Sequence, residues 1–151
     1  MTLIGCRVTG VFVAVTDQCS SPVVILDLDT DDRILPIYIG LWEAISISNA
    51  IRNELPPRPL THDLFIEFLR KFDISLVSLT VDTLEDGVYY GKLLLRGAGR
   101  EEVMDCRPSD GIALATRCGA EILLEPPVAS SSAIRKGDLP ELVDLPTYLY
   151  G

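Results

Sequence analysis

The chain is 151 residues long, the size of one ordinary domain, and 48% of its residues are hydrophobic, a balance that excludes a disordered protein. Its apolar runs are too short to span a bilayer and no secretory leader opens the chain, so we expect a cytoplasmic protein that does not contact membranes. The formal net charge of −9 argues against a broad surface for polyanions, because affinity for nucleic acids comes largely from Lys and Arg.

The first third of the chain predicts a meander of three strands. Polar and β-branched residues alternate over residues 7–16, 23–28 and 34–39, with turn-forming residues between them. Gly40 interrupts this pattern, and small and apolar residues then predict a helix that ends near Glu54 and packs on more than one side.

A second helix is expected after the proline-rich connection that follows. Thr61 can cap its first turn. Charged residues on this helix are expected to face water, while one stripe is formed by the apolar residues Leu64, Phe65, Phe68, Leu69 and Phe72.

The next part of the chain repeats the order of strands followed by a helix. Three strands, a helix and a final short strand are predicted over residues 75–83, 88–96, 101–106, 109–118 and 121–124. Pro108 fits the first position of this helix, because it has no N–H group to leave unbonded there.

The two halves of the chain can be aligned without gaps on Glu43 and Asp110. Each half then shows three strands followed by a helix that begins at a carboxylate. Identities between the halves are few, so the signal lies in the shared pattern. We therefore predict an α+β fold: a mostly antiparallel sheet built from two pseudo-repeated three-strand-plus-helix units, with three main helices on one face.

The domain is expected to span residues 1–128, followed by a C-terminal tail over residues 129–151. Prolines and serines in the tail argue against a further sheet strand. Its apolar side chains are too many for a solvated linker, so we expect it to dock on the domain or on a partner subunit. Because the helices carry apolar residues on several sides, we also expect a homo-oligomer.

Three motifs place charged residues at predicted helix starts. They are Gly40-Leu41-Trp42-Glu43-Ala44, Pro57-Arg58-Pro59-Leu60-Thr61-His62-Asp63 and Arg107-Pro108-Ser109-Asp110-Gly111-Ile112-Ala113-Leu114-Ala115. In type and in order they resemble the motifs of the bifunctional nuclease domain family, formerly a domain of unknown function. The resemblance covers about residues 8–128 and implies nuclease activity on DNA and RNA.

Asp110 and Glu43 each have two interpretations. A carboxylate in the first turn of a helix offsets the positive end of the helix dipole, which is worth about 0.3 to 1 kcal/mol. Alternatively, each is held at its helix start as a metal ligand, or, for Asp110, as a general base. If the two halves pack about a pseudo-twofold axis, the carboxylates could converge and suit Mg²⁺ or Mn²⁺.

His62 and Asp63 follow the start of the second predicted helix. His62 titrates near neutrality and can be a general base or a metal ligand, or it can be a hydrogen-bonding spacer beside a helix cap. Adjacent side chains in a first helical turn point apart, so Asp63 is not expected to orient His62. Arg58 lies in a stiff segment between two prolines, where it could bind phosphate or pair with Asp110 or Asp63.

The residues and the resemblance together suggest metal-assisted phosphodiester hydrolysis of DNA or RNA. The expected catalytic residues are His62, Asp63 and Asp110, the substrate-binding residues are Arg58, Arg107 and Ser109, and the ligands of Mg²⁺ or Mn²⁺ are Glu43, Asp63 and Asp110. The alternative is a non-catalytic oligomeric binding or regulatory module, in which the same residues form a salt-bridge network that fixes the helix starts. The acidic net charge favours this alternative.

Overall fold

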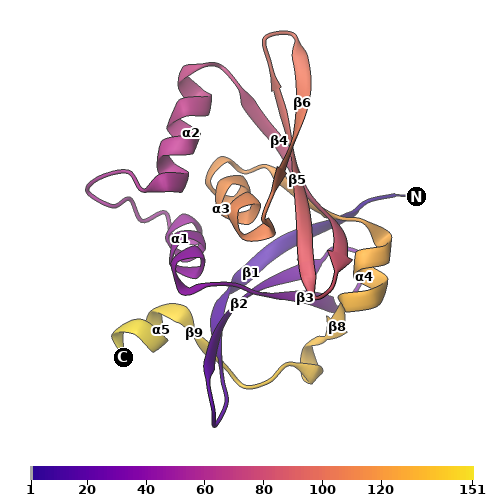
Figure 1. The fold of residues 1–151 in the computed structure, drawn as a ribbon. Coiled ribbons are helices and arrows are strands. Elements are labelled where there is room, and N and C mark those ends of the chain that lie inside the picture. The colour runs from indigo at the N-terminus through magenta and orange to yellow at the C-terminus, as the bar shows by residue number, and fades with distance from the viewer. Residues whose placement is uncertain (1) are drawn as a thin grey trace.

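Strand segments rich in apolar and β-branched residues form two antiparallel meanders, which join into one sheet (Figure 1). The computed structural model describes residues 2–151. The first meander comprises β1 (Ile4–Val15), β2 (Ser20–Leu28) and β3 (Arg33–Tyr38). The second comprises β4 (Ser75–Glu85), β5 (Val88–Gly97) and β6 (Arg100–Cys106).

A short strand, β7 (Glu121–Leu124), joins the two meanders. It lies between β4 and β1, parallel to β4 and antiparallel to β1, and the strand order is β6-β5-β4-β7-β1-β2-β3-β8. The innermost strands of the two meanders therefore run in opposite directions, as expected for two units related by an approximate twofold axis. The predicted α+β fold class, with a mostly antiparallel sheet of two pseudo-repeated units, is confirmed.

Each meander leads into a helix that packs on the same side of the sheet (Figure 1). These helices are α1 (Leu41–Ile51) and α3 (Pro108–Cys118), and α2 (Thr61–Lys71) lies between them in the chain. α1 and α3 also pack against each other, and Ala44 on α1 and Ile112 on α3 are completely buried. The starts of the two helices, which carry Glu43 and Asp110, are thereby brought close together.

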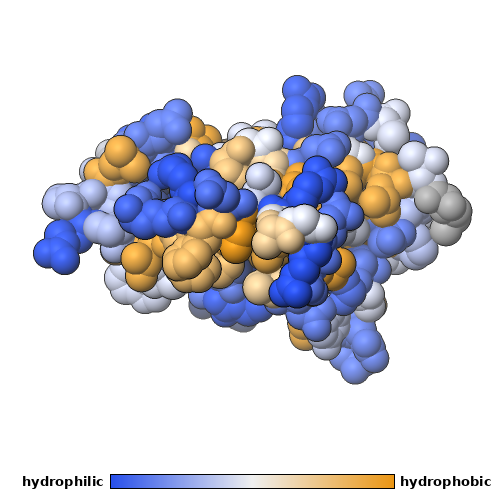
Figure 2. Space-filling model, turned by 90° about the horizontal axis from the view of Figure 1, so that it is seen from above, coloured by the Kyte–Doolittle hydropathy of each residue, from blue (hydrophilic) through white to orange (hydrophobic). Residues whose placement is uncertain are grey.

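The apolar stripe predicted on α2 is divided between core and surface. Leu69 is buried and Phe65 packs against the core. Leu64, Phe68 and Phe72 are instead 60%, 53% and 65% exposed. These three residues repeat every fourth position and so share a face that α3 and β4 do not cover. Figure 2 shows hydrophobic side chains at the surface on this side of the molecule, among hydrophilic ones.

The C-terminal segment packs on the first meander. After α4 (Pro126–Ser132), β8 (Ile134–Arg135) pairs with β3, and β9 (Leu142–Asp144) pairs with β1 before α5 (Leu145–Tyr150). The prediction that no sheet strand forms here was wrong. The reason is that β2 and β3 carry apolar residues on both faces, and the segment covers the face that α1 leaves open with Ile134, Leu139 and Leu142.

Within residues 2–151 no helix has both the length and the apolar character needed to cross a membrane.

Truncation of the Ile112 side chain tests the place of α3 in the core. Ile112 is fully buried, so Ile112→Ala is expected to lower the free energy of unfolding by about 2 to 5 kcal/mol, measured by urea denaturation. The control is Val103→Ala on β6, where the side chain is 62% exposed and the expected loss is less than about 1 kcal/mol. Equal losses in the two variants would contradict this packing.

Candidate functional site

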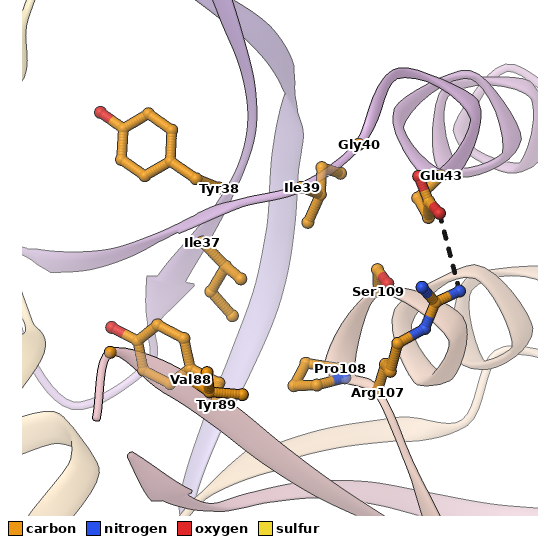
Figure 3. Close-up of a pocket in the computed structure, with 11 residues that line it drawn as sticks. Ile37, Tyr38, Ile39, Gly40, Glu43, Val88, Tyr89, Arg107, Pro108 and Ser109 are labelled. Carbon is orange, nitrogen blue, oxygen red and sulfur yellow. Dashed lines mark ion pairs between the residues drawn. The ribbon is translucent and has the colours of Figure 1, made fainter. Parts of the chain in front are cut away.

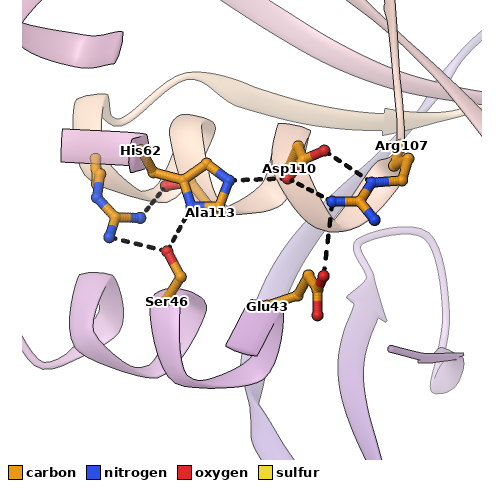
Figure 4. A network of polar contacts seen from close by, with 7 residues as sticks. Glu43, Ser46, His62, Arg107, Asp110 and Ala113 are labelled. Atoms are coloured by element: carbon orange, nitrogen blue, oxygen red, sulfur yellow. Dashed lines mark hydrogen bonds and ion pairs between the residues drawn. The ribbon is translucent and has the colours of Figure 1, made fainter. Parts of the chain in front are cut away.

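A row of polar side chains runs along the junction of α1, α2 and α3 (Figure 4). His62, from the first turn of α2, is at its centre. His62 Nε2 is 2.9 Å from Asp110 Oδ1, at the start of α3. His62 Nδ1 is 2.6 Å from Ser46 Oγ, on α1. Both ring nitrogens are therefore engaged, and the imidazole links all three helices.

Asp110, whose pKa is held below its usual value, accepts from the Nε2–H group of His62. Arg117 Nη2 donates to Ser46 Oγ over 3.1 Å. When Nδ1 of His62 carries no proton, it accepts from the Ser46 hydroxyl. Carboxylate, imidazole and hydroxyl follow one another as in serine hydrolases. The Ser46 hydroxyl, however, is already engaged by both His62 Nδ1 and Arg117 Nη2, and so it is not free to attack a substrate.

The exposed end of the row is the ion pair between Asp110 and Arg107. Arg107 Nε donates to Asp110 Oδ2 over 3.0 Å and Nη2 donates to Oδ1 over 3.3 Å. Burial alone would raise the pKa of Asp110, but the hydrogen bonds from Arg107 and His62 outweigh it and hold this pKa below its usual value. Asp110 is therefore ionised at neutral pH, while 67% of the Arg107 side chain faces solvent.

Glu43 approaches the same guanidinium from the start of α1. Its Oε1 is 3.6 Å from Arg107 Nη2, so Arg107 lies between the two carboxylates that occupy equivalent places in the two units. A Cβ atom at position 40 would collide with the Glu43 carboxylate. Glycine at the N-cap of α1 is thus what allows Glu43 to fold back against the helix start.

The buried end of the row is the ion pair between Asp63 and Arg117. Arg117 Nε donates to Asp63 Oδ1 over 2.8 Å, and the side chains are only 9% (Arg117) and 17% (Asp63) exposed. Asp63 Oδ2 also accepts from the Leu60 N–H and so caps α2. Burial would raise the pKa of Asp63, but the hydrogen bonds from Arg117 and Leu60 hold it below its usual value. As expected, Asp63 points away from its neighbour His62.

Arg58 takes no part in this row. It is exposed and, within residues 2–151, no carboxylate lies within ion-pair distance of it. The expected pairing of Arg58 with Asp110 or Asp63 is therefore not observed; Arg107 and Arg117 occupy these places. The flanking prolines keep Arg58 in the exposed connection between α1 and α2.

The three carboxylates expected to share a metal ion are held apart by arginines. Glu43 and Asp110 face Arg107, and Asp63 faces Arg117. In the described part of the chain no group of three or more His, Cys, Asp or Glu residues could hold a metal ion. The donor set therefore does not fit a resident Mg²⁺ or Mn²⁺, which would need several oxygen ligands.

Sequence reasoning missed two members of the row, Ser46 and Arg117. Helical spacing is the signal that could have found them. Arg117 lies two turns after Asp110 on α3, and Ser46 lies one turn after Glu43 on α1. Each therefore shares a helix face with a residue that the sequence analysis had already predicted to belong to the site.

A cavity of about 320 Å³ opens beside Arg107 (Figure 3). Figure 3 shows Glu43, Arg107 and Ser109 on one side of it and Ile37, Val88 and Tyr89 on the other. The starts of α1 and α3 both border this cavity, and neither N-cap residue offers a side-chain acceptor to the free N–H groups there. The row thus ends at a hollow that is accessible to a ligand.

The chain has recognisable relatives. A family model described as the bifunctional nuclease domain matches residues 24–137. An uncharacterised protein of Mycobacterium tuberculosis strain H37Rv is 34% identical over 128 residues, which is 85% of this chain and 75% of that protein. Bifunctional nuclease 1 of Oryza sativa subsp. japonica is 27% identical over 110 residues, covering 71% of this chain and 33% of the rice protein. Bifunctional nuclease 2 of the same plant is 26% identical over 125 residues, covering 80% and 38%.

Acid should weaken the fold through Asp63. Because the pKa of Asp63 is lower in the folded protein than its ordinary value of 3.8, its ionisation stabilises the fold above that value, and this contribution is lost as the pH falls through the folded pKa. We expect the free energy of unfolding, measured by urea denaturation, to fall below about pH 4, and to fall less steeply in Asp63→Asn. Asp17→Asn, in the exposed β1–β2 turn, is the control; if Asp63→Asn kept the wild-type slope, this role would be refuted.

Proposed function

Because the chain belongs to the bifunctional nuclease domain family, we propose that it is a nuclease that hydrolyses phosphodiester bonds of DNA and RNA. The observation that carries the proposal is the exposed end of the polar row. There a solvent-facing guanidinium, an ionised carboxylate and an imidazole lie together at the edge of a cavity. The rice relatives named bifunctional nucleases support the same reaction class.

In the proposed reaction Arg107 binds the substrate phosphate. Its planar guanidinium suits two phosphate oxygens, and its exposure allows it to turn from Asp110 towards a ligand. Asp110 then loses the cation that lowers its pKa and becomes a better proton acceptor. A water oxygen bonds to phosphorus, the bond from phosphorus to the leaving oxygen breaks, and the proton of the water goes to Asp110. The leaving oxygen takes its proton from solvent.

His62 holds Asp110 in this reaction through its Nε2–H group, and Ser46 and Arg117 hold His62 in turn. We assign Asp63 to the support of Arg117 and not to the chemistry, because it lies at the buried end of the row. Arg58 stays a proposed phosphate contact, since an exposed arginine in a proline-stiffened segment loses little entropy on binding. No step in this reaction passes through a metal ion.

The alternative function is a non-catalytic oligomeric module in which the row only fixes the helix starts. Two observations favour it. Most hydrogen-bonding groups of the row already have partners within the protein, and the net charge of −9 disfavours binding to polyanions. All four cysteines are free, which suits the cytoplasmic location that we propose under either function.

Cleavage assays separate the two functions. We expect the wild-type protein to cut single-stranded DNA or RNA, and Asp110→Asn and His62→Ala to cut at least about a hundredfold more slowly, because they remove the proton acceptor and the group that holds it. Asp105→Asn, on the exposed face of β6, is the matched control and should retain full activity.

The assay is run in EDTA and with added Mg²⁺ or Mn²⁺. The proposed reaction predicts that cleavage continues in EDTA. If cleavage strictly required a metal ion, the role of Asp110 as proton acceptor would be wrong and metal-assisted hydrolysis would take its place. Absence of cleavage of single-stranded and duplex nucleic acid under all three conditions would leave the non-catalytic module.

We also propose that the chain forms a homo-oligomer through the exposed face of α2. Leu64, Phe68 and Phe72 form an apolar surface that a second copy could cover. Sedimentation velocity is expected to give a multiple of the 16.6 kDa chain mass, and Phe68→Asp is expected to give the monomer. A wild-type protein that sediments as a monomer at micromolar concentrations would exclude this assembly.

A further inference from the structure

The cavity beside Arg107 contains two polar groups that the described chain leaves without hydrogen bonds. Ser109 is only 7% exposed, yet its hydroxyl has no hydrogen-bond partner among residues 2–151. The Glu43 carboxylate, with its side chain 23% exposed, also accepts no hydrogen bond from these residues, since Arg107 is 3.6 Å away. Both groups remain open to the cavity, because the fully buried side-chain atoms that lack a partner in the described chain belong to Asp27, Asp82 and Thr116 instead. Both groups face the same hollow, so a ligand that pairs with both would satisfy them.

Charge restricts the ligand. A cation in the cavity would be repelled by Arg107, whose guanidinium already approaches Glu43. An anion placed against Glu43 would be repelled by that carboxylate, whereas the exposed guanidinium of Arg107 can still turn towards a phosphate outside this position. The group that fits beside Glu43 is therefore neutral and carries N–H donors.

The opposite wall restricts the shape of the ligand. Ile37, Val88 and Tyr89 supply apolar and aromatic surface there. Ile39 and Pro108 add apolar surface to the rest of the lining. The volume of about 320 Å³ is at the small end of the roughly 300 to 1,000 Å³ that ligand pockets span. A flat ring with apolar faces and a polar edge matches such a cavity.

We propose that this cavity binds one unpaired guanine base of the substrate, an inference that rests on the proposed nuclease function. Guanine places two donors, N1–H and the N2 amino group, side by side on its Watson–Crick edge, where the two oxygens of Glu43 can accept them. The neighbouring O6 accepts the hydroxyl proton of Ser109. Adenine and cytosine offer one donor next to an acceptor, and uracil flanks its N3–H with two carbonyl oxygens that Glu43 repels.

This assignment has a consequence for the substrate. A base can enter the cavity only when it is unstacked and unpaired, so the substrate is a single strand or a loop. Arg107 lies between the cavity and Asp110, so the phosphate attached to the bound guanosine is directed towards the proposed proton acceptor. Cleavage is thereby expected next to guanosine.

Nucleotide binding to the full chain, measured by isothermal titration calorimetry in EDTA, tests the proposal. GMP is expected to bind about tenfold more tightly than IMP, which lacks only the N2 amino group, and also about tenfold more tightly than UMP. This ratio is near the lower end of the discrimination between bases that a pair of hydrogen bonds to one base gives. Glu43→Gln should abolish the difference between GMP and IMP, and Ser109→Ala should weaken GMP binding. Glu121→Gln, exposed at the start of β7, is the control.

The comparison of GMP with IMP uses the wild-type protein and so does not depend on whether the variants fold. Equal affinity for GMP, IMP and UMP overturns the proposal, as does a preference for GMP that survives Glu43→Gln or that appears only with added Mg²⁺. If the protein prefers GMP but cuts no nucleic acid, the nuclease function fails and the guanine site stands. If it cuts single strands without regard to base, the guanine site fails and the nuclease function stands.

Discussion

The close approach of α1 and α3 is the constraint on which the site depends. α1 and α3 pack against each other, and Ala44 on α1 and Ala113 and Ala115 on α3 are completely buried. Because each helix follows an equivalent meander, their starts meet on the same side of the sheet. Glu43 and Asp110 can share one guanidinium only because of this packing.

Along the polar row, stability and reactivity are located at different ends. At the buried end, Arg117 donates to Asp63, to Ser46 and to a backbone carbonyl, so its charge is compensated where the side chain is only 9% exposed. At the other end, the guanidinium of Arg107 is largely in solvent and can change partners at little cost. The imidazole of His62 connects a fixed end with an adaptable one.

The sequence predicted the strands of both meanders and the three main helices because their periodicities are local. A strand is indicated by residues that are adjacent in the sequence, and each helix start has Gly or Pro within a few residues. The motifs also identified Glu43, His62, Arg107 and Asp110, which the structure brings into one network. Their chemical roles stay predictions until cleavage is measured.

The partners of these residues could not be predicted in the same way. Arg117 contacts Asp63 across 54 residues of sequence and Ser46 across 71, and only the packing of helices decides such pairs. Arg58 looked equally suitable, but its backbone leads away from the carboxylates. The strands of the C-terminal segment were missed because they contain two and three residues, too few for an alternating pattern.

The pairing of this segment makes the two units unequal. β8 pairs with β3 at Arg33 and Ile34, and so the beginning of the outermost strand of the first unit is covered. The second unit ends at β6, whose outer backbone is uncovered and whose side chains include Arg100, Glu101, Glu102 and Asp105. Charged side chains on an edge strand discourage the addition of a strand from another molecule. The two outer edges of the sheet therefore differ: the first is shortened by a covering strand, and the second is protected by charged side chains.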